Sequence, residues 1–159
     1  MSDRILFVDD DENVLEGYMR LLRDEFRDEF DVDTAQGMSE AAAAIHLFGP
    51  YAVIISDIRM PGTNSAEPLA QMHQLVPGTV HVLLTDYKYI DQAIDAVNKG
   101  SIFRYLTKPC QKAELVDAVR LGIVYFHAKA EKQQTIKQVK EIELRAAVLN
   151  GLLQSCNSR

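Results

Sequence analysis

Five polar residues that could bind or accept a phosphoryl group occur where short apolar segments end. Asp9 and Asp10 follow one such segment, Asp57 follows a second, and Thr85 and Lys108 follow two others. An aspartate carboxylate can attack phosphorus to form an acyl phosphate. A lysine ammonium and a threonine hydroxyl can donate to phosphoryl oxygens. These residue types predict metal-assisted transfer of a phosphoryl group to a carboxylate, if the fold brings them together.

The acidic residues of this set also indicate a metal. Three carboxylates in one crevice repel each other, so some of them bind protons unless a multivalent cation neutralises them. Mg²⁺ is commonly shared between a few carboxylates and a phosphate. Each residue alone has an ordinary explanation as a helix cap, a turn residue or a solvated side chain. The functional interpretation depends on the combination, and Asp11 is expected to be only an N-cap.

The elements that must position these residues alternate between strands and helices. Apolar runs predict strands at 4–8, 30–34, 52–55, 79–84 and 102–106, and helical spacing predicts helices at 12–26, 37–48, about 66–75, about 90–98 and from about 112. Such an order predicts an α/β fold, a doubly wound five-stranded parallel sheet covered on both faces. Ligands of such sheets bind at the carboxyl ends of the strands, where the polar residues should converge. No comparable residue follows the second strand, which suits an edge strand.

The last helix is expected to continue beyond the compact domain. No glycine or proline lies between Lys129 and Asn150, so the helix could extend for some 40 residues, about 60 Å. After the polar segment 129–135, apolar residues recur at a spacing of three and four: Val139, Ile142, Ala146, Leu149 and Leu153. We expect a domain at 1–126 and a helical extension at 127–159, either a coiled coil with a helical partner or a linker. A frayed or collapsed terminal helix is the alternative.

Composition and charge exclude several other classes of protein. The chain of 159 residues has a net charge of -6 and no motif for binding DNA, so direct contact with nucleic acid is not expected. No apolar run is long enough for a membrane span or a signal peptide, so we expect no membrane association and a cytoplasmic protein. The two cysteines, Cys110 and Cys156, are expected to be free thiols.

Four segments together resemble the response-regulator receiver family of bacterial two-component systems. They are ILFVDDD (5–11), IISDIRMPG (54–62), LLT (83–85) and YLTKP (105–109), and the resemblance covers about residues 3–126. It implies a flavodoxin-like sheet with strand order 2-1-3-4-5. It also implies that Asp57 is the phosphoacceptor for a histidine kinase or phosphotransfer protein, and that Asp9, Asp10, Asp57 and the backbone carbonyl of Arg59 bind Mg²⁺, with Mn²⁺ as a substitute.

The resemblance implies a switch and an output surface as well. Thr85 and Lys108 would bind the phosphoryl group, and Tyr105 would turn into the space that Thr85 vacates. A cis bond before Pro109 would aim the lysine at the site. The fourth helix, fifth strand and fifth helix would carry the altered surface. Such a domain is a signalling module and not an enzyme, beyond catalysing its own phosphorylation and dephosphorylation.

The stretch 87–105 is similar to receivers that precede cyclic-di-nucleotide phosphodiesterase modules, yet no such module follows. The chain is therefore expected to be either a receiver with a helical tail or a fragment of a longer protein.

The sequence departs from the family pattern in two places. Asp86 follows the switch threonine, where the family usually has a small residue, and Asn64-Ser65 stands where the family often has Asp-Gly. We expect Arg59, Asp86 and Tyr87 to modulate the rates of phosphoryl transfer.

Two other functions remain open at this point. A pseudo-receiver would signal through its helical tail without phosphorylation. A phosphatase of the haloacid-dehalogenase type is disfavoured, because that family places its nucleophile after the first strand and a second Asp where this chain has Arg59.

Overall fold

Strands and helices alternate along the whole first part of the chain. The computed structural model describes residues 2–58, 67–99 and 101–158. The strands are β1 (Asp3–Asp9), β2 (Phe30–Gln36), β3 (Val53–Ser56), β4 (Val80–Asp86) and β5 (Arg104–Lys108). The helices are α1 (Glu12–Phe26), α2 (Met38–Phe48), α3 (Glu67–Leu75), α4 (Ile90–Asn98) and α5 (Lys112–Asn157), with a 3-10 turn at Tyr87–Tyr89 before α4. The predicted order of elements is confirmed.

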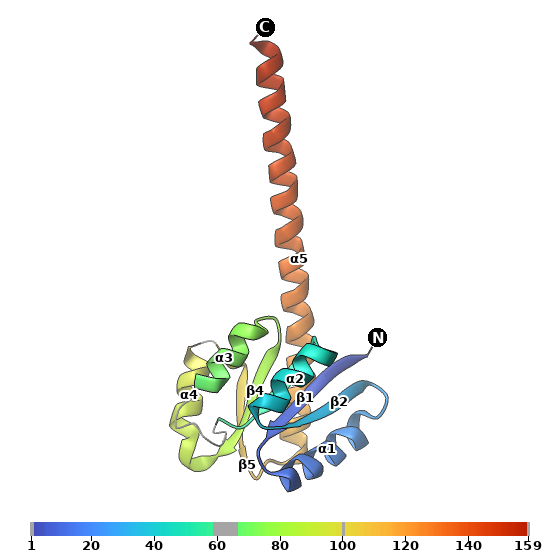
Figure 1. Ribbon diagram of the computed structural model, residues 1–159, viewed down its shortest axis with the longest axis vertical. Coiled ribbons are helices and arrows are strands. Elements are labelled where there is room, and N and C mark those ends of the chain that lie inside the picture. The colour runs from blue at the N-terminus through green and yellow to red at the C-terminus, as the bar shows by residue number, and fades with distance from the viewer. Residues whose placement is uncertain (1, 59–66, 100, 159) are drawn as a thin grey trace. The chain divides into compact units, whose positions relative to one another are not determined.

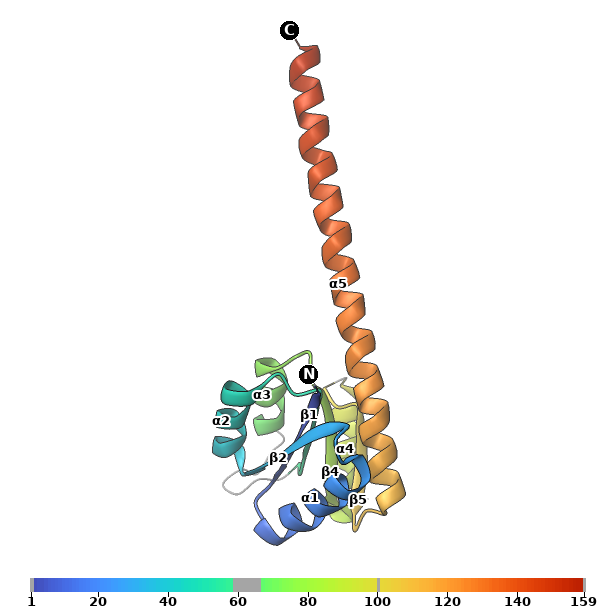
Figure 2. The same cartoon turned by 90° about the vertical axis from the view of Figure 1, so that its right-hand side faces the viewer.

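The five strands form one parallel sheet in the order β2-β1-β3-β4-β5 (Figure 1). This is the predicted doubly wound, flavodoxin-like topology, with β2 and β5 as the edge strands. Helices α1 and α5 pack on one face of the sheet and α2, α3 and α4 on the other. Figure 2 shows α2 and α3 on the opposite side of the sheet from α1. The carboxyl ends of all five strands consequently lie at one edge of the sheet.

Burial on both faces explains the continuous apolar runs of the central strands. Ile5, Leu6, Phe7 and Val8 of β1 are all at most 1% exposed, because successive side chains meet helices on opposite faces. On the face of α5, a Cβ added at Gly122 would lie 3.0 Å from Cγ2 of Val53. The absence of a side chain at Gly122 therefore lets α5 approach β3 closely.

Several strands extend further than their apolar runs. β4 ends at Asp86 and β5 at Lys108, because Thr85 pairs with Thr107 and Asp86 with Lys108 in the parallel ladder. The first residue of β5 is Arg104, two residues later than predicted. Thr85 is therefore the second-to-last residue of β4 and Lys108 is the last residue of β5, so the ladder fixes both backbones.

The chain divides into two compact units, residues 1–126 and 127–159. The second unit belongs to the continuous helix α5. Its apolar residues are exposed: Val139, Ile142, Leu149 and Leu153 have exposed fractions between 48% and 66%. Among the described residues, no helix is both long and apolar enough to cross a bilayer.

Candidate functional site

Asp9, the last residue of β1, is the most deeply buried acid at the carboxyl edge of the sheet. It is 1% exposed. Its Oδ1 accepts a hydrogen bond from the Asp11 backbone N–H at 3.0 Å, and its Oδ2 lies 2.8 Å from Lys108 Nζ. Asp11 Oδ1 in turn accepts from the Asn13 N–H at 2.9 Å, which confirms Asp11 as the N-cap of α1. These hydrogen bonds thus connect the acidic loop after β1 both to the start of α1 and to Lys108.

Lys108, at the end of β5, lies between two carboxylates from different strands. Its Nζ is 2.8 Å from Asp9 Oδ2 and 2.9 Å from Asp57 Oδ2. The lysine side chain is 18% exposed, and those of Asp9 and Asp57 are 2% and 10% exposed. Thr85 Oγ1, which is fully buried, donates to the other oxygen of Asp57 at 3.1 Å. Asp57 therefore contacts an ammonium through one oxygen and a hydroxyl through the other.

The charges of this cluster shift the pKa values of its members. Burial, the largest influence on Asp9, would raise its pKa, but hydrogen bonds from Lys108 and from the Asp11 N–H hold the pKa below its ordinary value. Burial alone would lower the pKa of Lys108, but the hydrogen bonds and charges of Asp9 and Asp57 raise it. The pKa of Asp10 is raised, first by burial and then by the neighbouring Asp9 carboxylate. Asp9 and Lys108 therefore form an ion pair at neutral pH.

The donor set suits a hard cation, although Lys108 supplies the positive charge in this structure. Asp9, Asp10 and Asp57 offer only carboxylate oxygens, which Mg²⁺ prefers. Within residues 2–58, 67–99 and 101–158, no three acidic, histidine or cysteine side chains converge closely enough to hold a metal. Lys108 contacts both Asp9 and Asp57, and Asp10 is exposed beside them in the sequence.

Four other residues that the sequence predicts for the site lie on β5 or at the ends of β4 and β5. Tyr105 is half-buried on β5, and the Lys108–Pro109 bond is cis. Asp86 and Tyr87 are exposed at the end of β4, Tyr87 to 74%. Arg59, the turn at 61–62 and Asn64-Ser65 lie outside the described residues.

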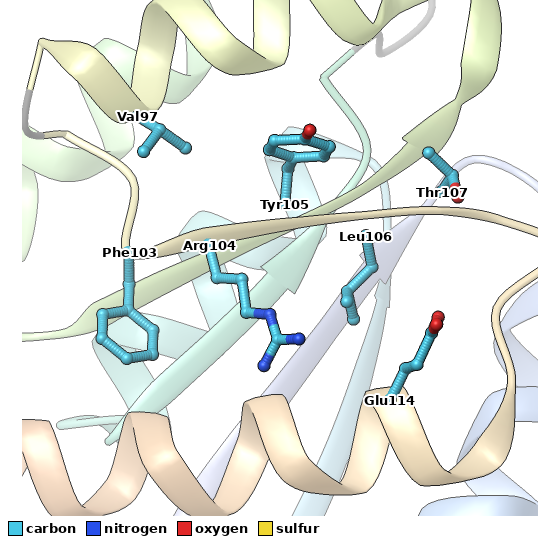
Figure 3. Close-up of a pocket in the computed structure, with 7 residues that line it drawn as sticks. All are labelled: Val97, Phe103, Arg104, Tyr105, Leu106, Thr107 and Glu114. Atoms are coloured by element: carbon cyan, nitrogen blue, oxygen red, sulfur yellow. The ribbon is translucent and has the colours of Figure 1, made fainter.

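A groove of about 420 Å³ lies over β5. Its lining residues come from α4, the residue before β5, β5 and α5: Val97, Phe103, Arg104, Tyr105, Leu106, Thr107 and Glu114. Figure 3 shows Tyr105 on the same side of β5 as Val97, and Arg104 and Leu106 on the side of Glu114. The half-buried ring of Tyr105 thus borders open space beside α4.

Gln36, the last residue of β2, contacts the acidic loop, and the sequence analysis did not assign it to the site. It pairs with Asp9 in the parallel ladder, and its Nε2 donates to the Asp10 carbonyl at 3.0 Å. The backbone N–H of Gln36 donates to Glu40 Oε2 at 2.7 Å, which fixes the start of α2 beside the acidic loop. Gln36 therefore restrains the backbone that presents Asp10. In the sequence, an amide just after the second predicted strand is a weak signal, because its neighbours are Ala35 and Gly37.

Comparison with known proteins gives a consistent result. The sequence model described as "Response regulator receiver domain" matches residues 5–120. The hydrogenase transcriptional regulatory protein HoxA of Cupriavidus necator is 33% identical over 126 residues, 77% of this chain and 25% of that protein. The alginate biosynthesis transcriptional regulatory protein AlgB of Pseudomonas aeruginosa is 32% identical over 96% of this chain and 34% of its own length. The chain thus spans about a quarter to a third of the length of the curated relatives that it matches.

Solved structures share the same architecture. The crystal structure of an adenylate cyclase from Rhodopirellula baltica has a TM-score of 0.76 and 34% identity, covering 86% of this chain and 98% of the other. The response regulator protein TrrA from Thermotoga maritima, in complex with Mg(2+)-BeF, has a TM-score of 0.62 and 28% identity, covering 76% and 98%.

Proposed function

This chain belongs to the family of response regulator receiver domains, and from that premise we propose that Asp57 accepts a phosphoryl group in a two-component phosphorelay. The donor would be a phosphohistidine of a histidine kinase or phosphotransfer protein. A carboxylate oxygen of Asp57 forms a bond to phosphorus while the P–N bond of the donor breaks and the imidazole leaves. The phosphoryl group is later lost to water, so the chain is a signalling module that catalyses only its own phosphorylation and dephosphorylation.

The arrangement of Lys108 and Thr85 around Asp57 carries this proposal. The Lys108 ammonium lies 2.9 Å from one carboxylate oxygen of Asp57, and the buried Thr85 hydroxyl lies 3.1 Å from the other. Both groups can donate hydrogen bonds to the oxygens of a phosphoryl group attached to Asp57. Both donors come from the carboxyl ends of strands that neighbour each other, β4 and β5. Their convergence on one aspartate favours a phosphoacceptor over an ordinary turn residue.

Mg²⁺ would be held by Asp9, Asp10, Asp57 and the backbone carbonyl of Arg59, with Mn²⁺ as a substitute. When bound, the cation neutralises charge on the phosphoryl oxygens. The contact with Lys108 helps to hold the pKa of Asp9 below its ordinary value, so its carboxylate is ionised and can bind a cation. Asp10 is exposed and has a raised pKa, so it would release any proton it carries when the cation binds.

The proposed output is a change in the surface formed by α4, β5 and α5. Once the phosphoryl group forms, Thr85 would turn from the carboxylate towards it, and Tyr105 would move from the groove into the space vacated. Tyr105 is half-buried and borders that groove, so its ring has room to move. We place the protein in the cytoplasm without direct contact to DNA or membrane, and we propose that the tail binds either a second copy or a helical effector.

The decisive experiment is incubation with acetyl phosphate, with Mg²⁺ or with EDTA, followed by intact mass measurement. The native chain should gain one phosphoryl group, about 80 Da, only with Mg²⁺. The variant Asp57→Asn is the matched control, since it keeps the shape but removes the nucleophile. No adduct in the native chain, or an equal adduct in the variant, would overturn the proposal and favour a pseudo-receiver that signals through its tail.

A further inference from the structure

The segment of α5 beyond Phe126 presents an apolar seam of exposed side chains. Val139, Ile142, Leu149 and Leu153 are 48%, 66%, 60% and 62% exposed. Burying apolar side chains such as these against a partner removes them from water, which favours association. Because they recur at a spacing of three and four, they lie along one side of the helix. A helix with this pattern is expected to pair with another helix.

The seam extends in a heptad pattern from Ala128 to Cys156. Its positions are Ala128, Lys132, Thr135, Val139, Ile142, Ala146, Leu149, Leu153 and Cys156, which alternate as d and a residues of four heptads. Two of these nine are polar, and they are adjacent. Thr135 is satisfied within the helix, because its Oγ1 donates to the Glu131 carbonyl at 3.0 Å. Thr135 can therefore enter a seam without losing a hydrogen bond.

We propose that this seam binds the same seam of a second copy of the chain, in parallel and in register. The inference rests on the proposed function, of which it specifies the partner of the tail. Identical helices in register place Lys132 against Lys132 and Thr135 against Thr135, so the polar residues meet each other and every other layer is apolar. A single lysine at an a position is a known means of setting register, at some cost in stability.

The length of the seam favours the parallel arrangement. In parallel, all nine positions from Ala128 to Cys156 pair, which meets the three to four heptads that a stable coiled coil needs. An antiparallel pair of the same length sets Lys132 against Leu149. An antiparallel pair that avoids the lysine begins at Val139 and has fewer than three heptads.

Charges beside the seam agree with a second copy as the partner. In the parallel pair, Glu131 at position g adjoins Lys132 at position a of the other helix, so opposite charges meet. The pairs of g and e positions along the seam are Glu131 with Ile136, Gln138 with Glu143, Arg145 with Asn150 and Leu152 with Asn157. None of these pairs sets like charges together, so the helix does not repel its own copy at these positions.

The first test is the mass of the full chain by light scattering over a dilution series. The native chain should be a dimer at high concentration. Ile142→Gln should raise the dissociation constant by at least about 100-fold, because two apolar side chains per dimer are lost from the seam. Leu144→Gln is the matched control: Leu144 is exposed to the same 66% but lies on another side of the helix. A monomeric native chain, or a larger effect of Leu144→Gln, would overturn the proposal.

The second test reports the orientation of the helices. With Cys110→Ser, Cys156 becomes the sole cysteine. A short bis-maleimide should then link two chains in high yield, because a parallel pair in register places both Cys156 residues in one layer. The yield should fall to background after adding Ile142→Gln. Absence of the linked dimer in a chain that light scattering shows to be dimeric would overturn the parallel arrangement.

Failure of this inference is distinguishable from failure of the proposed function. Phosphorylation of Asp57 depends on residues 1–126, whereas Ile142→Gln changes only the tail. The variant should take up the phosphoryl group from acetyl phosphate as the native chain does, whatever its oligomeric state.

Discussion

Lys108 Nζ lies 2.9 Å from Asp57 Oδ2 although the two residues are 51 positions apart in the chain. The same ammonium lies 2.8 Å from Asp9 Oδ2. One lysine thus contacts the two carboxylates that the proposed function assigns to phosphoryl transfer and metal binding. This relationship allows the role of each charge to be measured separately.

Replacement of Lys108 by alanine should destabilise the protein in EDTA. Removing one partner of a largely buried ion pair leaves Asp9 and Asp57 uncompensated, and we expect a loss of about 2–4 kcal/mol in the free energy of unfolding. Lys112→Ala is the control, since Lys112 is 58% exposed and pairs with Glu25 at the surface, and should cost less than about 1 kcal/mol. Urea unfolding measures both.

Mg²⁺ should restore part of the stability lost in Lys108→Ala, because the cation supplies positive charge to the same carboxylates. Equal losses in the Lys108 and Lys112 variants, or no response to Mg²⁺, would contradict the assignment of this cluster.

The stability of the metal-free protein should depend on pH with opposite signs for Asp9 and Asp10. The pKa of Asp9 is lowered by folding from 3.8, so its stabilising contribution is present above pH 3.8 and is lost as the pH falls through the folded pKa. The pKa of Asp10 is raised from 3.8, so its contribution is present below that pH and is lost as the pH rises through the folded pKa. Unfolding of Asp9→Asn and Asp10→Asn from pH 3 to pH 7, in EDTA, separates the two. At pH 7 the first variant should be less stable than the native chain and the second more stable.

Replacement of Asp86 by alanine should accelerate phosphorylation, dephosphorylation or both. Asp86 is exposed at the end of β4 directly after Thr85, and its charge repels an approaching anion. Asp117→Ala, which removes an exposed aspartate from α5, controls for the change in net charge. Rates with acetyl phosphate by intact mass should change for Asp86→Ala alone, and unchanged rates would rule out this role of Asp86.

The two cysteines should differ in reactivity. Burial, and next the nearby Glu114 carboxylate, raise the pKa of the Cys110 thiol to about 11, whereas Cys156 is exposed. At pH 8 only about one Cys110 in a thousand is the reactive thiolate. At a concentration where the chain is monomeric, a thiol reagent should therefore label Cys156 first, and Cys156→Ser should leave only the slow reaction. Fast labelling of Cys110 would show that its environment is more open.

The sequence alone determined the elements and their order. Short apolar runs with β-branched residues, such as Ile5–Val8, favour strands buried on both faces, and their alternation with helical segments favours parallel strands. The polar residues at four strand ends then had to meet at one edge. The unbroken helix from Lys112 and its exposed second stripe were also predictable, because nothing in the sequence ends the helix.

Only the tertiary structure decided how the side chains are paired. Periodicity cannot show that Lys108 lies between Asp9 and Asp57, because that contact depends on the register of β5 and β1 across three intervening ladders. Gln36 could not be assigned for the same reason: its role follows from its pairing with Asp9 in the ladder. Local sequence sets which residues favour a strand or a helix, whereas the contacts that create the charged site are formed between segments far apart in the chain, by the packing of the sheet.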